Sequence, residues 1–470
     1  MEQHNERPNR PRRRKRTQFE IFKETYLPAA IVCAALLLIV IFIIGSISHA
    51  VQRNKLEHNR QEAQAQALLD EQKMLREKVD AALAQADMLA ESISFDEAIS
   101  LLDALPEITH NYQDVAAKRA ELVALKQSLV LWEDNSRVLN LSFQLLIADS
   151  QRAFNDPSYG TSYKDNFVTT EEFTNILQEL YENNYILVSL DDIIEVSPLG
   201  DGVIYEGKQL YLPAGKKPLI ITQTNVNYNT YMIDSDGDKL ADKGGDGFAS
   251  RLVIDDNNML SCEIVHADGT VDTGAYDLVP ILESFIATHP DFSYKHARAI
   301  LAVTGYDGLF GYRTTAAAEA HFGADYCQKE REAVTEIVQK LRNCGYEIAC
   351  YTYGNTAYGT SDLLTINGEL DKWSTETMQL LGECDVIAFA KNSDISNTST
   401  LYSGDKFNAL YNAGFRYFLG FSNDGKPWSV CSDTYMRQGR ILVSGSNMKN
   451  HTDWFTGIFD VSAVLDSARN

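Results

Sequence analysis

The chain has 470 residues and a formal net charge of −23. Residues 1–24 contain eight Lys and Arg against four Glu, so the rest of the chain carries about −27. Such a polyanion repels phosphate backbones, which argues against a nucleic-acid partner.

Residues 25–50 predict a transmembrane helix, because no Asp, Glu, Lys or Arg occurs between residues 25 and 52. About 20 apolar residues are enough to cross a bilayer core. Basic flanks stay in the cytoplasm, so we expect a cytoplasmic tail over 1–24. The remainder would be extracytoplasmic, held in the cell membrane by a single-pass signal-anchor. A signal peptide cleaved near Ala50 is the alternative.

Residues 51–134 are rich in Ala, Gln, Glu and Leu and predict a helical stalk. Between Ala65 and Leu89, small and apolar residues recur at three- and four-residue spacings, which is typical of a coiled coil and would allow a homodimer through the stalk. Two later amphipathic segments, 95–105 and 115–130, resemble one tetratricopeptide-like hairpin. A plain spacer and a partner-binding module both fit this pattern.

From residue 139 to the end, strand patterns alternate with helical ones. Thr169 and Glu172 form a capping-box pattern at the start of a helix, and a strand follows at 185–190. This alternation predicts an α/β domain over 139–470, built as a barrel or as an open parallel sheet, with its chemistry on the loops after the strands. Further strands are expected at 218–222, 251–254, 299–303, 346–351, 386–390, 415–421 and 440–444, and helices at 277–289, 328–343, 373–383 and 405–413. Six cysteines in this part are compatible with disulfides or with free thiols.

Two of the predicted strand ends carry a family resemblance. They read Leu-Ile-Ile-Thr-Gln-Thr-Asn over 219–225 and Ala-Cys-Tyr-Thr-Tyr-Gly-Asn over 349–355. With these motifs the chain resembles the polysaccharide deacetylase family, which are metal-dependent carbohydrate esterases. The resemblance extends from Leu139 to the C-terminus, and Val226-Asn227-Tyr228 is similar to the first motif of membrane-anchored relatives. It implies a distorted β/α barrel.

The same resemblance implies which residues stand at the family's catalytic positions. Thr224 takes the place of the base Asp and Asn225 that of the metal-binding Asp, while Tyr351 and Asn355 replace the two His ligands. These side chains supply neither a base nor good zinc ligands, so we expect no zinc and no catalysis. If the motifs are aligned correctly, the four residues meet at one mouth of the barrel.

We therefore expect a catalytically silent deacetylase-like domain that binds a cell-wall or other envelope glycan, or an envelope protein. The alternative is an active metal-dependent polysaccharide or peptidoglycan deacetylase with rearranged ligands. Arg313 could orient a substrate anion. Aromatic side chains near the candidate loops, among them Tyr312, Tyr353 and Trp428, could stack on a sugar.

A second motif, Asp-Ser-Asp-Gly-Asp over 234–238 and continuing to Asp242, predicts a calcium loop. Carboxylates at alternate positions can surround one hard cation with oxygen. The candidate ligands are Asp234, Asp236, Asp238 and Asp242. A solvated acidic turn is the alternative.

Overall fold

The computed structural model describes residues 17–200, 202–234, 237–243, 245–396 and 400–469. The chain divides into two compact units, Met1–Ala81 and Ala82–Asn470. The sequence-predicted basic tail falls mostly outside the described residues.

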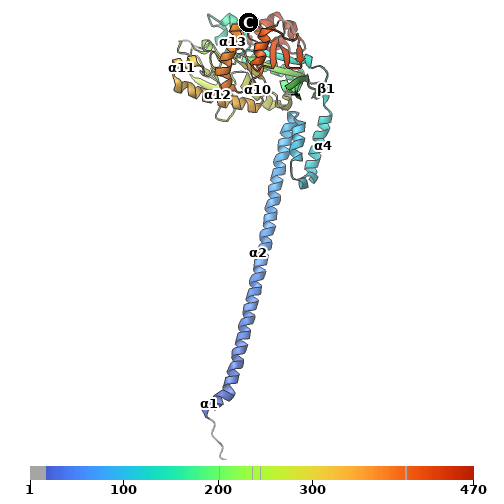
Figure 1. Cartoon of the computed structure of the whole chain (residues 1–470), viewed down its shortest axis with the longest axis vertical. Helices are drawn as coiled ribbons and strands as arrows, with labels where there is room; N and C mark the ends of the chain where they lie inside the picture. The colour runs from blue at the N-terminus through green and yellow to red at the C-terminus, as the bar shows by residue number, and fades with distance from the viewer. Residues whose placement is uncertain (1–16, 201, 235–236, 244, 397–399, 470) are drawn as a thin grey trace, which may run out of the picture. The chain divides into compact units, whose positions relative to one another are not determined.

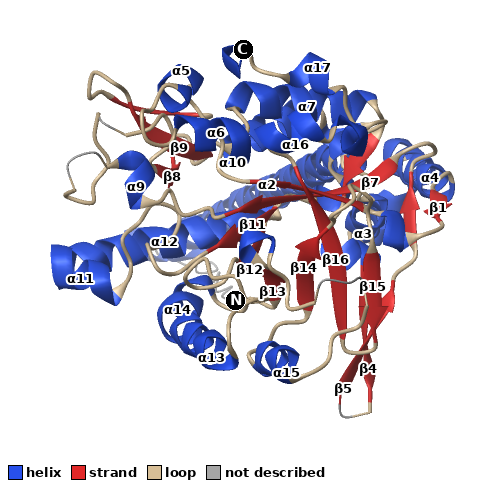
Figure 2. Ribbon diagram, turned by 90° about the horizontal axis from the view of Figure 1, so that it is seen from above, coloured by secondary structure: helices blue, strands red, loops and turns tan. Residues whose placement is uncertain are grey.

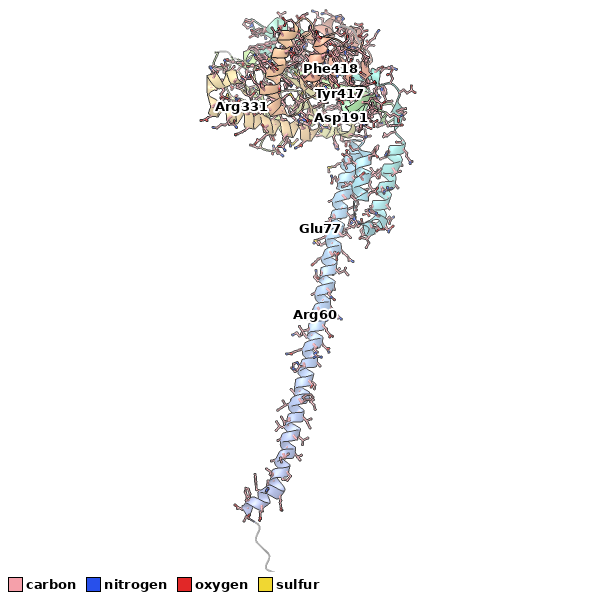
Figure 3. All side chains as sticks on the ribbon, viewed as in Figure 1. Arg60, Glu77, Asp191, Arg331, Tyr417 and Phe418 are labelled. Carbon is pink, nitrogen blue, oxygen red and sulfur yellow. The ribbon has the colours of Figure 1, made fainter. Side chains whose placement is uncertain are left out.

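The first unit is helical. It contains α1 (Gln18–Ile21), a π-helical turn η1 (Phe22–Tyr26) and most of α2 (Leu27–Glu91) (Figure 1). Within the described ranges, the continuous helix Gln18–Glu91 is the one helix that is long and apolar enough to cross a membrane. Its apolar side chains face outward, with Leu36 56% and Phe42 76% exposed. Charged residues such as Arg60 and Glu77 follow further along α2 (Figure 3). The expected spanning-length helix is therefore present.

The second unit is built on a closed barrel of parallel strands. Its order is β2-β7-β11-β12-β13-β14-β16, and β16 pairs back to β2 through Ile441 and Leu141. The ring is also continuous between β7 and β11, where Thr224 pairs with Ala302. The strands (red in Figure 2) are β2 (Leu139–Phe143), β7 (Lys217–Thr224), β11 (Ile300–Val303), β12 (Glu347–Cys350), β13 (Val386–Ala388), β14 (Tyr417–Phe421) and β16 (Tyr435–Leu442). Of the two architectures expected from the sequence, the barrel is the one that forms.

Helices cover the outside of the barrel. Alternate strand residues, such as Leu141, Ile221 and Phe418, point outward into one large apolar core. The predicted capping box at the start of α7 forms, because Thr169 N donates to Glu172 Oε2 (2.8 Å) and Glu172 N donates to Thr169 Oγ1 (3.1 Å). The covering helices are α7 (Thr170–Glu182), α10 (Leu278–Thr288), α12 (Ala324–Cys344), α13 (Leu363–Lys372), η6 (Trp373–Thr377), α14 (Met378–Leu381), α15 (Asp405–Asn412) and α16 (Gly445–Asn450).

The opposite set of strand residues points into the barrel. Near the strand starts these are apolar, including Ile220, Ile300 and Met436, and they share a second core with Phe95 and Leu122. The last turns of α2, together with α3 (Phe95–Asp103) and α4 (Gln113–Gln127), thus pack with residues of the barrel interior. The compact unit begins at Ala82 and includes these helices, whose apolar faces share a core with the barrel interior. The helical stalk expected over 51–134 stays a prediction.

Several elements lie outside the closed ring. The predicted strand at 251–254 is β8 (Arg251–Ile254), which belongs to an antiparallel meander with β9 (Leu260–Val265) and β10 (Val271–Gly274) instead of the barrel. β3 (Tyr185–Leu187) pairs with β7, and β15 (Ser429–Ser432) pairs with β16. Two antiparallel pairs join β1 (Val130–Trp132) to β6 (Leu210–Leu212) and β4 (Ile194–Leu199) to β5 (Gly202–Gly207). The short helices are α5 (Ser150–Phe154), α6 (Gly160–Asn166), α8 (Leu190–Ile193), α9 (Thr230–Ile233), α11 (Ala316–Phe322) and α17 (Val461–Val464). The cysteines, all of which lie in the described ranges, are free thiols.

Candidate functional site at the barrel mouth

A pocket of about 280 Å³ opens where the barrel strands end, and we call it the mouth pocket. Parallel strands bring their carboxyl ends to the same rim, where barrel enzymes place their functional groups. Six of the seven barrel strands contribute a residue from near their C-terminal end or from the loop that follows. The lining consists of Ser142, Gln144, Asn166, Thr224, Asn225, Tyr351, Asn355, Lys391, Asn392, Phe421, Arg440 and Leu442.

All four residues at the resembled catalytic positions line this pocket, as expected from the alignment of the motifs. Thr224 is the last residue of β7, and its hydroxyl donates to the carbonyl of Phe143 on β2 (3.1 Å). Asn225 follows it, and its side chain is 6% exposed. Tyr351 and Asn355 come from the loop after β12. The four residues therefore line a single pocket, and their correspondence to the family's catalytic positions stays a prediction.

The donor set of the mouth pocket does not fit a zinc ion. Its lining contains no Asp, Glu, His or Cys, which are the groups that bind zinc in proteins. In the described part of the chain, no group of three or more such side chains is arranged to hold a metal. Two carboxylates that contact the motif segments already accept hydrogen bonds: Asp277 from Gln223 (2.7 Å) and Glu369, on α13, from the Gly354 amide (3.1 Å).

Two amide oxygens at the pocket lack partners. Oδ1 of Asn225 and Oδ1 of Asn355 are both buried and accept no hydrogen bond from the described residues. An unpaired buried acceptor costs about 1–3 kcal/mol, so such atoms in a pocket indicate a ligand or water that donates to them. The mouth pocket is thus prepared to accept hydrogen bonds.

Arg440 supplies a buried positive charge on the wall of the pocket. It is 1% exposed, and burial lowers its pKa to about 10, so the guanidinium remains charged at neutral pH. Its donors reach neutral acceptors: Gly420 O (3.2 Å), Phe389 O (2.8 Å) and Ser142 Oγ (3.3 Å). The group also stacks over Phe421, 4.4 Å from the ring centroid. Arg440 is not among the binding residues predicted from the sequence. An arginine inside a barrel strand was nevertheless a detectable signal, because buried parallel strands are usually apolar.

Below Arg440 the barrel interior is filled by a closed polar network. Thr222 Oγ1 donates to Asn140 Oδ1 (2.9 Å), and Asn140 Nδ2 donates to Gln438 Oε1 (2.9 Å). All three side chains are fully buried. These groups satisfy one another by hydrogen bonds and form a floor for the pocket. The unpaired groups of the pocket therefore lie at its mouth.

The loops at the mouth hold an unusual backbone. Asn225, Asn355, Lys391 and Asn392 line the pocket with φ between +51° and +58°. Asparagine tolerates this left-handed region, whereas lysine rarely adopts it. Strained backbone of this kind gathers at functional sites. Lys391 is exposed at the rim and places an ammonium group there.

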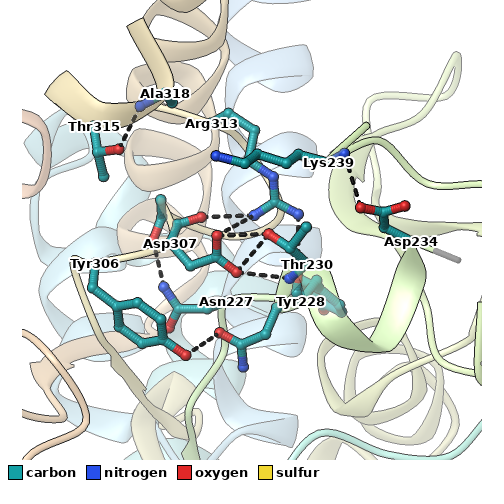
Figure 4. A network of polar contacts seen from close by, with 12 residues as sticks. Asn227, Tyr228, Thr230, Asp234, Lys239, Tyr306, Asp307, Arg313, Thr315 and Ala318 are labelled. Carbon is teal, nitrogen blue, oxygen red and sulfur yellow. Dashed lines mark hydrogen bonds and ion pairs between the residues drawn. The ribbon is translucent and has the colours of Figure 1, made fainter. Parts of the chain in front are cut away.

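The other predicted binding residues do not line the mouth pocket. Arg313 is 4% exposed and donates to the carbonyls of Asp307 (2.6 Å) and Tyr228 (3.1 Å), so it fixes a loop (Figure 4). Tyr312 lies under the Arg251 guanidinium (4.9 Å), and burial raises its pKa to about 12.

Tyr353 and Trp428 are likewise engaged within the protein. The Tyr353 hydroxyl donates to Glu376 (2.8 Å), and the Trp428 indole donates to the Phe421 carbonyl (3.2 Å). A substrate role for either residue stays a prediction.

The acidic loop is only partly described, because Asp236 lies outside the described residues. Asp234 accepts hydrogen bonds from the amides of Gly237 and Lys239, both at 2.8 Å, and Asp238 accepts one from the amide of Leu240. Such bonds are typical of an Asp-rich turn and also occur in calcium loops. Calcium binding stays a prediction.

Comparison with known proteins gives a remote structural likeness. No protein-family profile and no curated protein matches the chain. The Streptococcus pyogenes deacetylase PplD, in complex with acetate, is 12% identical with a TM-score of 0.33, over 68% of this chain and 95% of that one. A polysaccharide deacetylase from Bacillus cereus is 11% identical with the same TM-score, over 72% of this chain and 70% of that one. The barrel is established by its own strand pairing.

Proposed function

We propose that the chain is a membrane-tethered, deacetylase-like barrel that binds a glycan in the mouth pocket without hydrolysing it. One observation carries the proposal. The residues at the resembled catalytic positions do meet in one pocket, and they are Thr224, Asn225, Tyr351 and Asn355. Amide hydrolysis by this route needs a metal-bound hydroxide and a base, and this set offers neither.

The lining favours a sugar as the ligand. Hydroxyl and amide groups can exchange hydrogen bonds with sugar hydroxyls, and Tyr351 and Phe421 add aromatic surface. The volume of about 280 Å³ lies just below the usual range of small-molecule sites, about 300–1,000 Å³. We therefore expect the pocket to hold one sugar unit of a longer chain.

The membrane helix determines where that sugar would be met. A cytoplasmic basic tail would leave the barrel on the outer face, within reach of cell-wall or other envelope glycans. The helical segment between membrane and barrel would act as a spacer, and pairing of two stalks would present two pockets together.

The test uses the full chain purified in detergent. Isothermal titration with acetylated chitooligosaccharide and with peptidoglycan fragments should show binding without acetate release, and metal analysis should find no stoichiometric zinc. Filling the pocket with Gln144→Trp should abolish binding. Gln178→Trp, on the exposed face of α7, is the matched control and should bind normally.

Two results would contradict the proposal in different ways. Stoichiometric zinc together with acetate release would establish an active deacetylase with rearranged ligands. Failure to bind any glycan, with a normal melting profile, would leave an envelope protein as the partner.

A further inference from the structure

We propose that the sugar recognised by the mouth pocket carries a carboxylate, which the Arg440 guanidinium binds. This inference rests on the proposed glycan binding and specifies its ligand class. It is drawn from the charge and the unused hydrogen-bonding groups of the pocket.

Arg440 has donors to spare. A guanidinium has five N–H donors, and Arg440 uses three of them, on the carbonyls of Gly420 and Phe389 and the hydroxyl of Ser142. Among the described residues, no acceptor takes the remaining N–H of Nη1 or that of Nη2. A carboxylate matches paired guanidinium donors in geometry and charge.

The positive charge of Arg440 is not neutralised by an ion pair within the described chain. The buried Asp394 nearby is bound to Arg437, whose Nη2 lies 2.9 Å from Asp394 Oδ2. The Tyr402 hydroxyl also donates to Asp394. Of the two buried arginines on β16, Arg437 therefore has a carboxylate partner and Arg440 has none in the described chain. Lys391 adds another cation at the rim. An anion in the pocket would balance this charge, which is costly to bury alone.

Two amide oxygens without a donor among the described residues favour a ligand that also donates hydrogen bonds. Asn225 Oδ1 and Asn355 Oδ1 are acceptors, so a bare inorganic anion would leave them unsatisfied. A sugar acid offers both kinds of group, because its hydroxyls donate while its carboxylate accepts. The two sets of unused groups in the mouth pocket thus match one class of ligand.

The experiment compares two ligands that differ only in the carboxylate. Hyaluronan tetrasaccharide and its carboxyl-reduced form are titrated against the full chain in detergent. We expect the acidic form to bind about tenfold more tightly, because charged hydrogen bonds are lost in the reduced form. Raising the salt concentration should narrow the difference.

Three variants assign the effect. Arg440→Gln should remove the preference for the acidic form, and Lys391→Gln should reduce it while leaving the fold intact, since Lys391 is exposed. Arg416→Gln is the matched control. Arg416 also donates to carbonyls, those of Tyr411 and Phe415, but it lies at the opposite end of the barrel.

Equal affinity for the two forms would overturn the inference while leaving glycan binding in place. Tighter binding of a sulfated neutral-sugar oligosaccharide than of the carboxylate would also overturn it, in favour of a sulfate. Absence of binding to acidic and neutral glycans alike would instead refute the proposed function itself.

Discussion

Replacing Lys391 by Asn should stabilise the protein and weaken its binding of an acidic glycan. Lys391 has φ +53° and ψ +34°, a left-handed conformation that costs an L-residue about 1–2 kcal/mol. Asn adopts this region more readily, so we expect a gain of about 1 kcal/mol. For a compact unit of about 390 residues this corresponds to a rise in melting temperature of about 1 °C.

The same change removes a cation from the rim of the mouth pocket. An exposed ion pair contributes about 0.2–1 kcal/mol, so the affinity for an acidic oligosaccharide should fall about 1.4- to 5-fold. Lys295→Asn is the matched control. Lys295 has φ +49° and ψ +42° and is also exposed, but it does not line the pocket.

Scanning calorimetry and isothermal titration on the detergent-solubilised chain measure the two effects. Both Asn variants should melt slightly higher than the wild type, and only Lys391→Asn should lose affinity. A lower melting temperature for both variants would refute the argument from backbone strain. Unchanged affinity of Lys391→Asn at low salt would remove Lys391 from the binding site.

Three further predictions concern stability. Burial and the neighbouring Asp385 and Asp191 raise the pKa of Glu347 to about 8. The folded protein therefore keeps a proton that the unfolded chain releases above about pH 4.3. The free energy of unfolding, measured with urea, should fall by up to about 1.4 kcal/mol per pH unit as the pH rises toward 8. Glu347→Gln should flatten this slope. Arg469→Ala should cost about 3–5 kcal/mol, because it removes the cation that pairs with buried Glu172 (2.7 Å). The double variant Glu172→Gln/Arg469→Met should cost less than the two single changes together. If the acidic loop binds calcium, about 1 mM calcium should raise the melting temperature and Asp236→Ala should abolish the rise; no shift in the wild type would end that prediction.

Local sequence patterns were sufficient to predict the elements whose structure depends on residues close together in the chain. The apolar run at the start of α2 predicts a spanning-length helix from composition alone, and Thr169 with Glu172 predicts the start of α7 from capping chemistry. The two motif-bearing strand ends could be read in the same way, because a parallel barrel gathers its strand ends at one rim. That rule was sufficient to predict that Thr224 and Tyr351 share a site.

Only the tertiary structure decided which strands close the barrel and which charges remain unpaired. Alternating apolar residues show that a segment has a buried face, but they do not name its partner, so β8 was expected to be a strand without being recognised as part of a separate meander. Closure depends on Leu141 meeting Ile441 across 300 residues. The same long-range packing brings the Arg313 guanidinium to carbonyls of nearby loops. It leaves the Arg440 guanidinium, which lines the mouth pocket, with spare N–H donors. Whether an arginine is structural or available to a ligand depends on acceptors that come from distant parts of the chain.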